Sequence, residues 1–310
     1  MMLRNATSPQ IVAFGDNDVD CYEAHGAMYP GGNALNVAVF ARRAGADAAF
    51  IGAMADDPAG RHMSVALERE GVNITRLRRV AGRTAFCVIG NTASGEREFL
   101  RADLGVSIIA PNAGDLEMIA RADVVHTGRS AHVEAHLSAF SNRARLSFDF
   151  ADQAGADYVD AIAPLCFLAS FSGGSMTDAE VATLQARVRK AGAIWCLVTR
   201  GQNGAYLTGP DTDVGVPPAP AEIVDTLGAG DSFIARVLTG LLRGEDPRAL
   251  MQAAAIMAGE TCGQRGGFGH PAPIDIDQSH AMPIGLIHAH AAELADRARK
   301  RSAETGVPAK

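Results

Sequence analysis

The sequence predicts an α/β fold in which a doubly wound, mostly parallel sheet is flanked by helices. Short, uninterrupted apolar runs recur along the chain, stretches with helical spacing separate them, and a glycine-rich turn precedes a helical pattern in its last quarter. Such runs are typical of strands buried on both faces of a parallel sheet. The 310 residues, 47% of them hydrophobic, suffice for one large domain or two small ones.

Six apolar runs are expected to form the strands: residues 10–14, 48–51, 123–126, 146–150, 166–169 and 193–199. Helices are expected over residues 33–44, 58–70, 113–121, 131–143 and 176–191. In the last of these, Thr177 and Glu180 have the spacing of a capping box. His132 and His136 are spaced one helical turn apart, but no third ligand is near in sequence, so we interpret them as a polar helix face.

Two stretches, about residues 17–30 and 83–102, interrupt this alternation. They lack helical periodicity, carry β-branched and aromatic residues, and contain Gly26, Gly90 and Gly95. We expect small hairpins that form a β-strand lid over the carboxyl edge of the sheet, where open α/β folds bind ligands. The main domain is predicted to end at residue 277, and residues 278–310 to be a C-terminal extension, with a peripheral helix and a partly disordered end.

Charge and composition argue against several classes of partner. The net charge is -7 and the basic residues are mostly scattered, so nucleic acid is not an expected partner. No apolar stretch approaches the roughly 20 residues of a membrane span, so we expect no membrane partner. Five cysteines, without any C-x-x-C spacing, indicate reduced thiols and a cytoplasmic protein.

Residues 225–233, which read DTLGAGDSF, carry the strongest chemical signal. Residues 223–224 are expected to end a strand, and apolar residues follow Phe233 at helical spacing, so Gly228, Ala229 and Gly230 should open a helix. Unpaired N–H groups and the helix dipole make such a start an anion site. Asp231 lies in the same turn, where an acid stays ionised at neutral pH. It is therefore suited to act as a base that takes a proton from a hydroxyl while the amides hold a phosphoryl group.

A helix-capping turn is the simpler interpretation of this string, but acids at both ends of the glycine turn favour the functional one. The chain contains no G-x-x-x-x-G-K-[ST] pattern, and the turn does not complete G-x-G-x-x-G. A P-loop ATPase and a dinucleotide dehydrogenase are therefore disfavoured.

Three further motifs are candidate ligand contacts. Gly31, Gly32 and Asn33 begin a helix, and one turn later Asn36 offers a second amide to a polyol. Acids follow the first strand at positions 16, 18 and 20, and a solvated loop and a ligand site are equally good interpretations of this cluster. Asp20 is the preferred ligand contact among them. After the strand at 193–199, Thr199, Gly201 and Gly204 are expected to turn into a hairpin along a nucleotide.

From about residue 11 to 273 the chain resembles the ribokinase-like carbohydrate kinases of the phosphofructokinase B type, which transfer the γ-phosphoryl of ATP to a sugar hydroxyl. The resemblance implies a ribokinase-like fold, with Asp231 as catalytic base and the amides of Gly228, Ala229 and Gly230 as the anion hole. It implies sugar contacts at Asp20, Gly31, Gly32, Asn33 and Asn36, and ATP contacts at Thr199, Gly201 and Gly204. Asp225 is similar to the acid that helps hold a monovalent cation such as K⁺ in several members.

Within this family the motifs look most like those of fructoselysine 6-kinases, which phosphorylate a glycated amino acid at the primary 6-hydroxyl. The resemblance implies ATP and Mg²⁺ as cofactors and, from family habit, a homodimer through the lid. A kinase for a free sugar, a sugar acid or a nucleoside, and a sugar- or nucleotide-binding sensor without catalysis, are the alternatives.

One departure from the family pattern concerns magnesium. Where members carry Asn-x-x-Glu, whose Glu organises the water shell of Mg²⁺, this chain has Ser170-Phe-Ser-Gly173 and no carboxylate. Either the ion is held mainly by nucleotide phosphates and waters, or activity is lowered. Asp178 and Glu180 are alternative acids, although helix capping suffices to explain them, and we interpret the departure as a subfamily trait.

Overall fold

A doubly wound central sheet forms the body of the molecule. The computed structural model describes residues 8–91 and 97–304, so Gly95 lies outside the described residues. The eight strands of the sheet are ordered β14-β13-β12-β11-β10-β9-β1-β4. From β12 to β4 neighbouring strands are parallel, whereas β13 and β14 are antiparallel. The bounds are β1 Gln10–Phe14, β4 Asp47–Ile51, β9 Val124–Gly128, β10 Arg145–Asp149, β11 Cys166–Ser172, β12 Trp195–Thr199, β13 Ala205–Gly209 and β14 Thr212–Val216.

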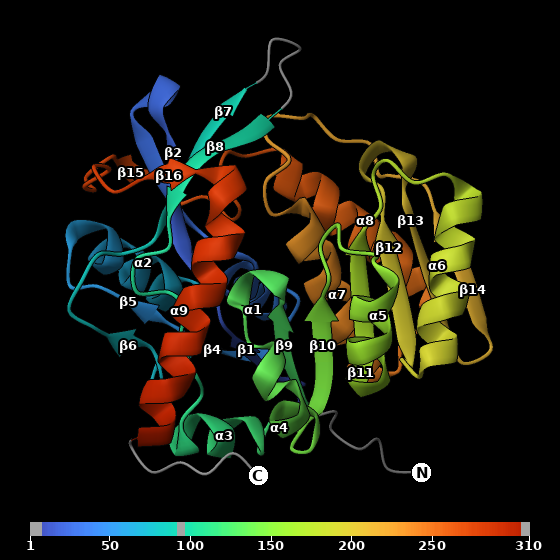
Figure 1. Cartoon of the computed structure of the whole chain (residues 1–310). Coiled ribbons are helices and arrows are strands. Elements are labelled where there is room, and N and C mark those ends of the chain that lie inside the picture. The colour runs from blue at the N-terminus through green and yellow to red at the C-terminus, as the bar shows by residue number, and fades with distance from the viewer. Residues whose placement is uncertain (1–7, 92–96, 305–310) are drawn as a thin grey trace.

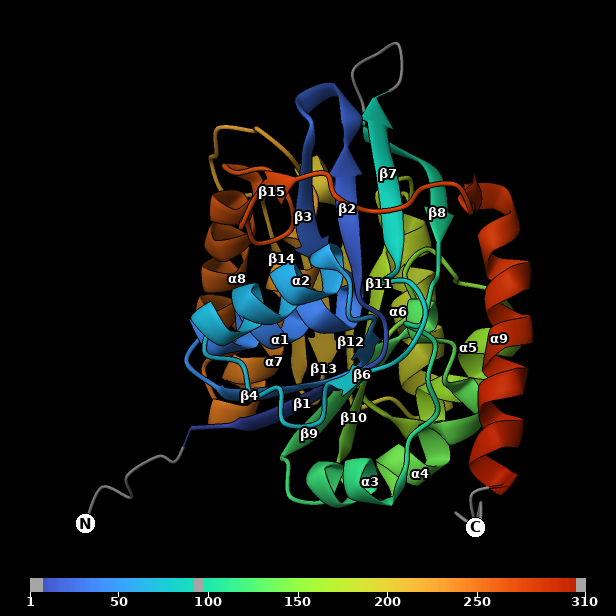
Figure 2. The same cartoon turned by 90° about the vertical axis from the view of Figure 1, so that its left-hand side faces the viewer.

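Helices cover both faces of this sheet, which confirms the predicted α/β architecture (Figures 1 and 2). Figure 2 shows α1, α7 and α8 on one side and α5 and α6 on the other. All six predicted apolar runs lie in the sheet, because their side chains are buried from both sides. The helices are α1 Asn33–Arg43, α2 Pro58–Arg69, α3 Ala113–Ile119, α4 Leu137–Ser141, α5 Ala156–Ile162, α6 Asp178–Ala191, α7 Ala229–Arg243, α8 Pro247–Cys262 and α9 Ile284–Glu304.

The predicted capping box at the start of α6 is confirmed, whereas the predicted helix over residues 131–143 and the predicted strand end at residues 223–224 are wrong. At α6, Thr177 N donates to Glu180 Oε2 at 2.7 Å, the predicted capping box. Residues 131–143 do not form one helix, because His132 adopts a left-handed φ of 52°, after which a 3-10 turn, Glu134–His136, leads into the short α4. Residues 223–224 are not a strand end but an exposed loop, in which Ile223 is 62% exposed.

A second sheet lies over the carboxyl ends of the central strands (Figure 1). Its order is β15-β3-β2-β7-β8-β16, and β2/β3 and β7/β8 are the antiparallel hairpins expected for a lid. The bounds are β2 Asp18–Tyr22, β3 Ala27–Gly31, β7 Phe86–Asn91, β8 Arg97–Asp103, β15 Ala272–Pro273 and β16 Met282–Pro283. A two-stranded pair, β5 Ala53–Met54 and β6 Arg78–Arg79, lies beside the body.

Segments late in the chain cover both edges of this lid. β15 pairs with β3, β16 pairs with β8, and α9 follows β16 directly. The division into a domain of residues 1–277 and an extension of residues 278–310 stays a prediction, and residues 305–310 lie outside the described part of the chain. Among the described residues, no helix combines the length and the apolar composition needed to span a membrane.

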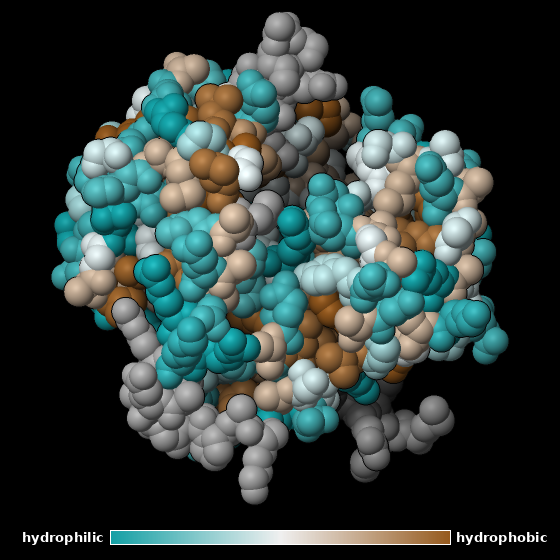
Figure 3. Space-filling model, in the orientation of Figure 1, coloured by the Kyte–Doolittle hydropathy of each residue, from teal (hydrophilic) through white to brown (hydrophobic). Residues whose placement is uncertain are grey.

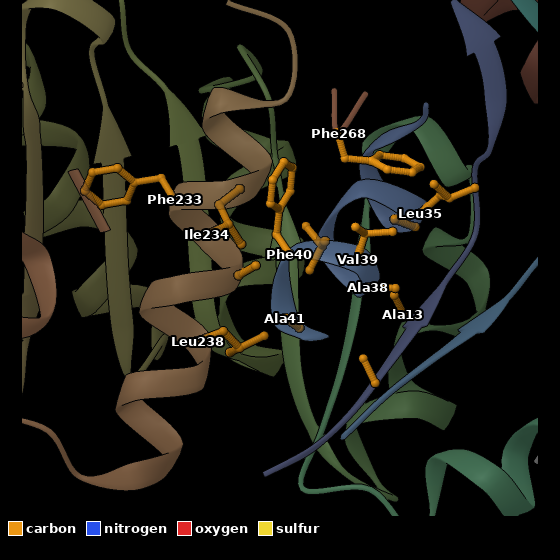
Figure 4. Close-up of a cluster of buried hydrophobic side chains, with 14 of the residues drawn as sticks. Ala13, Leu35, Ala38, Val39, Phe40, Ala41, Phe233, Ile234, Leu238 and Phe268 are labelled. Atoms are coloured by element: carbon orange, nitrogen blue, oxygen red, sulfur yellow. The ribbon is translucent and has the colours of Figure 1, made fainter. Parts of the chain in front are cut away.

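Packing between α1 and α7 positions the candidate site. Figure 4 shows Phe40 and Ala41 of α1 beside Ile234 and Leu238 of α7, in the largest of the three apolar clusters. Each side chain of this kind stabilises the fold by about 1.5–3 kcal/mol when fully buried. Because the two helices pack closely, their first turns meet at the carboxyl edge of the central sheet, below the lid.

Candidate active site

The first turns of α1 and α7 bring Asp231 and two asparagines together. Asn33 Nδ2 donates to Asp231 Oδ1 at 2.8 Å, and Asn36 Nδ2 donates to Asp231 Oδ2 at 2.7 Å. A spacing of three residues places both amides on one face of α1, as the sequence predicts. These contacts hold both oxygens of the carboxylate in one orientation, so Asn33 and Asn36 orient Asp231 besides facing the cavity described below.

A chain of polar groups that the sequence analysis missed lies behind Asn33. Asn33 Nδ2 also donates to Asp149 Oδ2 at 2.9 Å, so its Oδ1 is the acceptor for His126 Nε2 at 3.3 Å. His126 Nδ1 then accepts from Ser147 Oγ at 2.9 Å. Burial lowers the pKa of His126 to about 3, so the imidazole stays neutral and keeps this tautomer at neutral pH.

Three acids around Asn33 have raised pKa values. Burial, followed by the charge of Asp231, raises the pKa of Asp149 to about 7. Burial, followed by the charges of Asp16 and Asp231, raises the pKa of Asp18 to about 7. Burial also raises the pKa of Asp16, although it accepts from the backbone N–H of Asn33 at 2.8 Å. So many buried carboxylates without an equal number of cations favour a ligand that brings donors or positive charge.

These shifts predict a fall in stability as pH rises. Between about pH 4 and 7 folded Asp149 keeps a proton that the unfolded chain has released, so the free energy of unfolding should decrease over this range. Asp149→Asn should reduce that slope, as measured by urea unfolding of the ligand-free protein between pH 5 and 8. His126 acts with the opposite sign below pH 6.5, and therefore wild type and variant are compared at each pH. Equal slopes would contradict the assignment.

A cavity of about 400 Å³ lies between the lid and this cluster, and Asp20, Gly32 and Asp231 are among the residues that line it. Figure 3 shows the surface hollowed between the lid and the body on this face of the molecule. Asp16, Asp18 and Asp20 line the cavity, and the last two lie in strand β2 rather than in a solvated loop. A side chain at Gly31 would lie 2.1 Å from Asp20 Oδ2, which explains why a glycine stands beside this buried acid.

Three buried acceptor atoms near the cavity have no hydrogen-bond partner among the described residues. They are Oδ1 of Asn17, Oδ1 of Asp18 and Oδ1 of Asn36, and all three residues line the cavity. A buried polar atom without a partner costs about 1–3 kcal/mol. A ligand that carries several hydroxyl donors would remove this cost, so the cavity is suited to a polyol.

The predicted glycine turn opens α7, with Gly228 as the N-cap residue and Ala229 and Gly230 in the first turn. Gly228 has a φ of 77°, and a side chain there would lie 2.7 Å from Gly267 Cα. The Gly266-Gly267 loop that packs here was missed, although a Gly-Gly pair signals close backbone approach. The N–H group of Ala229 donates to Thr226 O at 3.4 Å, and the turn lies next to Asp231, where a helix start can bind an anion.

Asp225 joins this turn to two other segments. Leu227 N donates to its Oδ1 at 3.0 Å, Gly266 N donates to its Oδ2 at 3.1 Å, and the Tyr22 hydroxyl of lid strand β2 also donates to Oδ2. The carboxylate is 9% exposed. Its predicted contact with a monovalent cation stays a prediction.

The residues predicted to face ATP lie at the same edge of the sheet but outside the acceptor cavity. Thr199 ends β12, and Gly201 and Gly204 flank a single 3-10 turn that leads into β13, as the predicted hairpin requires. β12 lies two strands from β10, which corresponds to about 10 Å.

The two alternative magnesium acids are engaged elsewhere. Asp178 pairs with Arg200, and Glu180 caps α6 through Thr177. Ser170, at the position of the family motif, instead pairs in register with Asp149 of β10. Among the described residues, no group of three or more His, Cys, Asp or Glu side chains could hold a metal ion.

Comparison with known proteins identifies the family. The model of the pfkB family carbohydrate kinases matches residues 4–274. The chain belongs to this family. It is therefore an ATP-dependent phosphotransferase that binds a sugar and ATP.

Two named relatives of this pfkB family kinase are a fructosamine kinase and a fructoselysine 6-kinase. It is 35% identical to fructosamine kinase FrlD of Bacillus subtilis (strain 168), across 86% of this chain and 96% of the relative. It is 30% identical to fructoselysine 6-kinase of Escherichia coli (strain K12), across 80% and 95% of the two chains. Among solved structures, the ribokinase of Arabidopsis thaliana complexed with ribose and ATP superimposes with a TM-score of 0.72 at 19% identity, across 85% and 95%, which shows the shared ribokinase-like fold.

Proposed function

We propose that this kinase transfers the γ-phosphoryl of ATP to the primary 6-hydroxyl of a glycated amino acid such as fructoselysine. The observation that supports this proposal most strongly is the position of Asp231. The side-chain amides of Asn33 and Asn36 orient its carboxylate in the first turn of α7, where a helix start can bind an anion. Asp231 also lines the cavity, whose buried acceptor atoms can bind hydroxyl groups. The names of the two most similar relatives described above support the acceptor class.

In this mechanism the acceptor hydroxyl donates to Asp231. Asp231 takes the proton as the hydroxyl oxygen bonds to the γ-phosphorus, and the bond to the bridging oxygen of ADP breaks. The N–H groups of Gly228, Ala229 and Gly230 stabilise the charge on the transferring oxygens. Asp20, Asn33 and Asn36, with the backbone at Gly31 and Gly32, hold the other hydroxyls, so that one oxygen is aimed at phosphorus.

ATP is proposed to lie along Thr199, Gly201 and Gly204, with the lid closed over the acceptor. Mg²⁺ would neutralise charge on its phosphates and keep most of its waters, because no group of three or more His, Cys, Asp or Glu side chains in the described part of the chain could hold the ion. Asp149 is the acid best placed to accept from those waters, because it shares the Asn33 amide with Asp231. K⁺ beside Asp225 would add positive charge near the anion hole.

Two further features belong to this proposal. A cytoplasmic location is supported by the five cysteines, all buried as thiols. A homodimer through the lid is supported by the 40% exposure of Leu100 on β8, and sedimentation equilibrium measures it directly.

An acceptor panel tests the function. Purified protein is assayed with ATP and Mg²⁺ against fructoselysine, fructosylglycine, fructose and ribose, and the phosphorylated carbon is located by NMR. We expect the highest kcat/KM with a fructosamine and the phosphoryl group on C6. A preference for fructose or ribose would indicate a kinase for free sugars, and binding without turnover would indicate a sensor.

A further inference from the structure

The C-terminal helix α9 forms part of the wall of the acceptor cavity. Its start is fixed to the lid by β16, in which Met282 pairs with Ala102 and Pro283 with Arg101 of β8. Arg101 Nη2 also donates to Gln278 Oε1 at 3.0 Å. The segment lies beyond residues 4–274, the part matched by the family model, so its position is a feature of this chain rather than of that model.

Two isoleucines in the first turn of α9 line the cavity. Ile287 is 6% exposed and shares an apolar cluster with Cys87, Ala102 and Leu227, and Ile284 packs against the same cluster. Ile284, Ile287 and the buried Ala291 are spaced by three and four residues, which places them on one helix face. Charged residues such as Lys300, 70% exposed, lie on the outer surface of the helix, which is largely hydrophilic in Figure 3.

The cavity therefore has two chemically different parts. Asp231, Asn33 and Asn36 form one hydrogen-bonded group that suits sugar hydroxyls. The apolar cluster around Ile287 and Leu104 forms the other, and a sugar alone has no apolar surface of this extent to offer it. Arg129 and Asp152 also line the cavity, where Arg129 Nη1 and Asp152 Oδ1 form an ion pair at 3.9 Å and the Asp152 side chain is 75% exposed.

We propose that Ile284 and Ile287 bind the apolar stem of the non-sugar part of the acceptor, and that α9 thereby selects the substrate. This proposal rests on the proposed function. In fructoselysine, four methylene groups separate the sugar nitrogen from an ammonium and a carboxylate. The stem matches the apolar wall, and the ammonium and carboxylate, which share one carbon, match the opposite charges of the Asp152–Arg129 ion pair. Fructosylglycine lacks the stem, and fructose lacks the whole substituent.

The test compares Ile284→Ala and Ile287→Ala with Leu286→Ala, a control in the same turn whose side chain is 60% exposed. kcat/KM is measured for fructoselysine, fructosylglycine and fructose at saturating ATP. We expect each isoleucine variant to lower kcat/KM for fructoselysine about tenfold. The values for fructosylglycine and fructose should stay within about twofold of wild type, and Leu286→Ala should match wild type throughout.

An unchanged ratio between fructoselysine and fructosylglycine in variants with wild-type melting temperatures would overturn the proposal. An equal loss for all acceptors would also overturn it, because α9 would then support the site as a whole. If Ile287→Ala does not fold, Ile284→Ala still carries the test, because Ile284 is only half-buried. Failure of the proposed function is visible separately, since wild type would then phosphorylate neither fructosamine.

Discussion

Asp231→Asn is expected to lower kcat roughly 10²- to 10⁴-fold, the usual contribution of a general base. An amide keeps the shape of the carboxylate but does not accept the hydroxyl proton at neutral pH. It also turns an NH₂ group toward Asn33 or Asn36, both of which donate to the wild-type oxygens. Single-turnover phosphorylation of fructoselysine measures the chemical step, and calorimetry with the sugar alone should find a much smaller change in affinity.

The same substitution at a surface acid provides the control for effects of Asp231→Asn on folding and purification. Asp160→Asn removes an acid that pairs with Arg187 on the surface, so kcat should match that of wild type. Turnover of Asp231→Asn close to that of this control would disprove the role of Asp231 as the base.

Gly228→Ala is expected to have the second largest effect, with kcat lowered roughly 10²- to 10³-fold, as for loss of an oxyanion-hole donor. The φ of 77° disfavours alanine, and the new Cβ would lie 2.7 Å from Gly267 Cα and 2.8 Å from its carbonyl oxygen. Backbone atoms cannot rotate away as a side chain can, so the turn must shift. Its N–H groups would then no longer point toward the transferring phosphoryl group. Steady-state kinetics together with thermal unfolding separate this loss from instability.

The glycine at the other end of the same helix provides the control. Gly244 is the C-cap residue of α7 with a φ of 70°, and a side chain there would meet nothing within 4 Å. Gly244→Ala should cost about 1 kcal/mol of stability and leave kcat unchanged. If both variants lost only stability, the shape of the Gly228 turn would not matter for catalysis.

Local patterns predicted much of the fold and the two helix starts that carry the candidate site. Buried parallel strands must be apolar throughout, and Gly228 had to begin a helix, so both could be found without tertiary information. Loops and short helices were harder, because the left-handed backbone at His132 has no signal in its residue type. In the same way, the apolar Ile223 and Val224 resembled a strand although they lie in a loop.

Contacts between distant segments account for the site residues that were missed. His126 reaches Asn33 only because β9 and α1 pack together, and a buried histidine in an apolar run looks like core. Asp149 was more accessible to prediction, since a lone acid at the carboxyl end of a strand is a signal in an open sheet. The isoleucines of α9 could not be assigned, because their role depends on how β16 joins the lid.

The hydrogen bond from Tyr22 to Asp225 has a consequence for timing within the reaction cycle. Tyr22 belongs to the roof over the acceptor, whereas Asp225 is bonded to the backbone just before the phosphoryl-binding amides. If β2 moves away from the body to admit a substrate, this bond breaks and the loop that leads into α7 loses its contact with the lid. Such an open molecule would catalyse ATP hydrolysis poorly, because the turn proposed to bind the phosphoryl group would not be held in place when water enters.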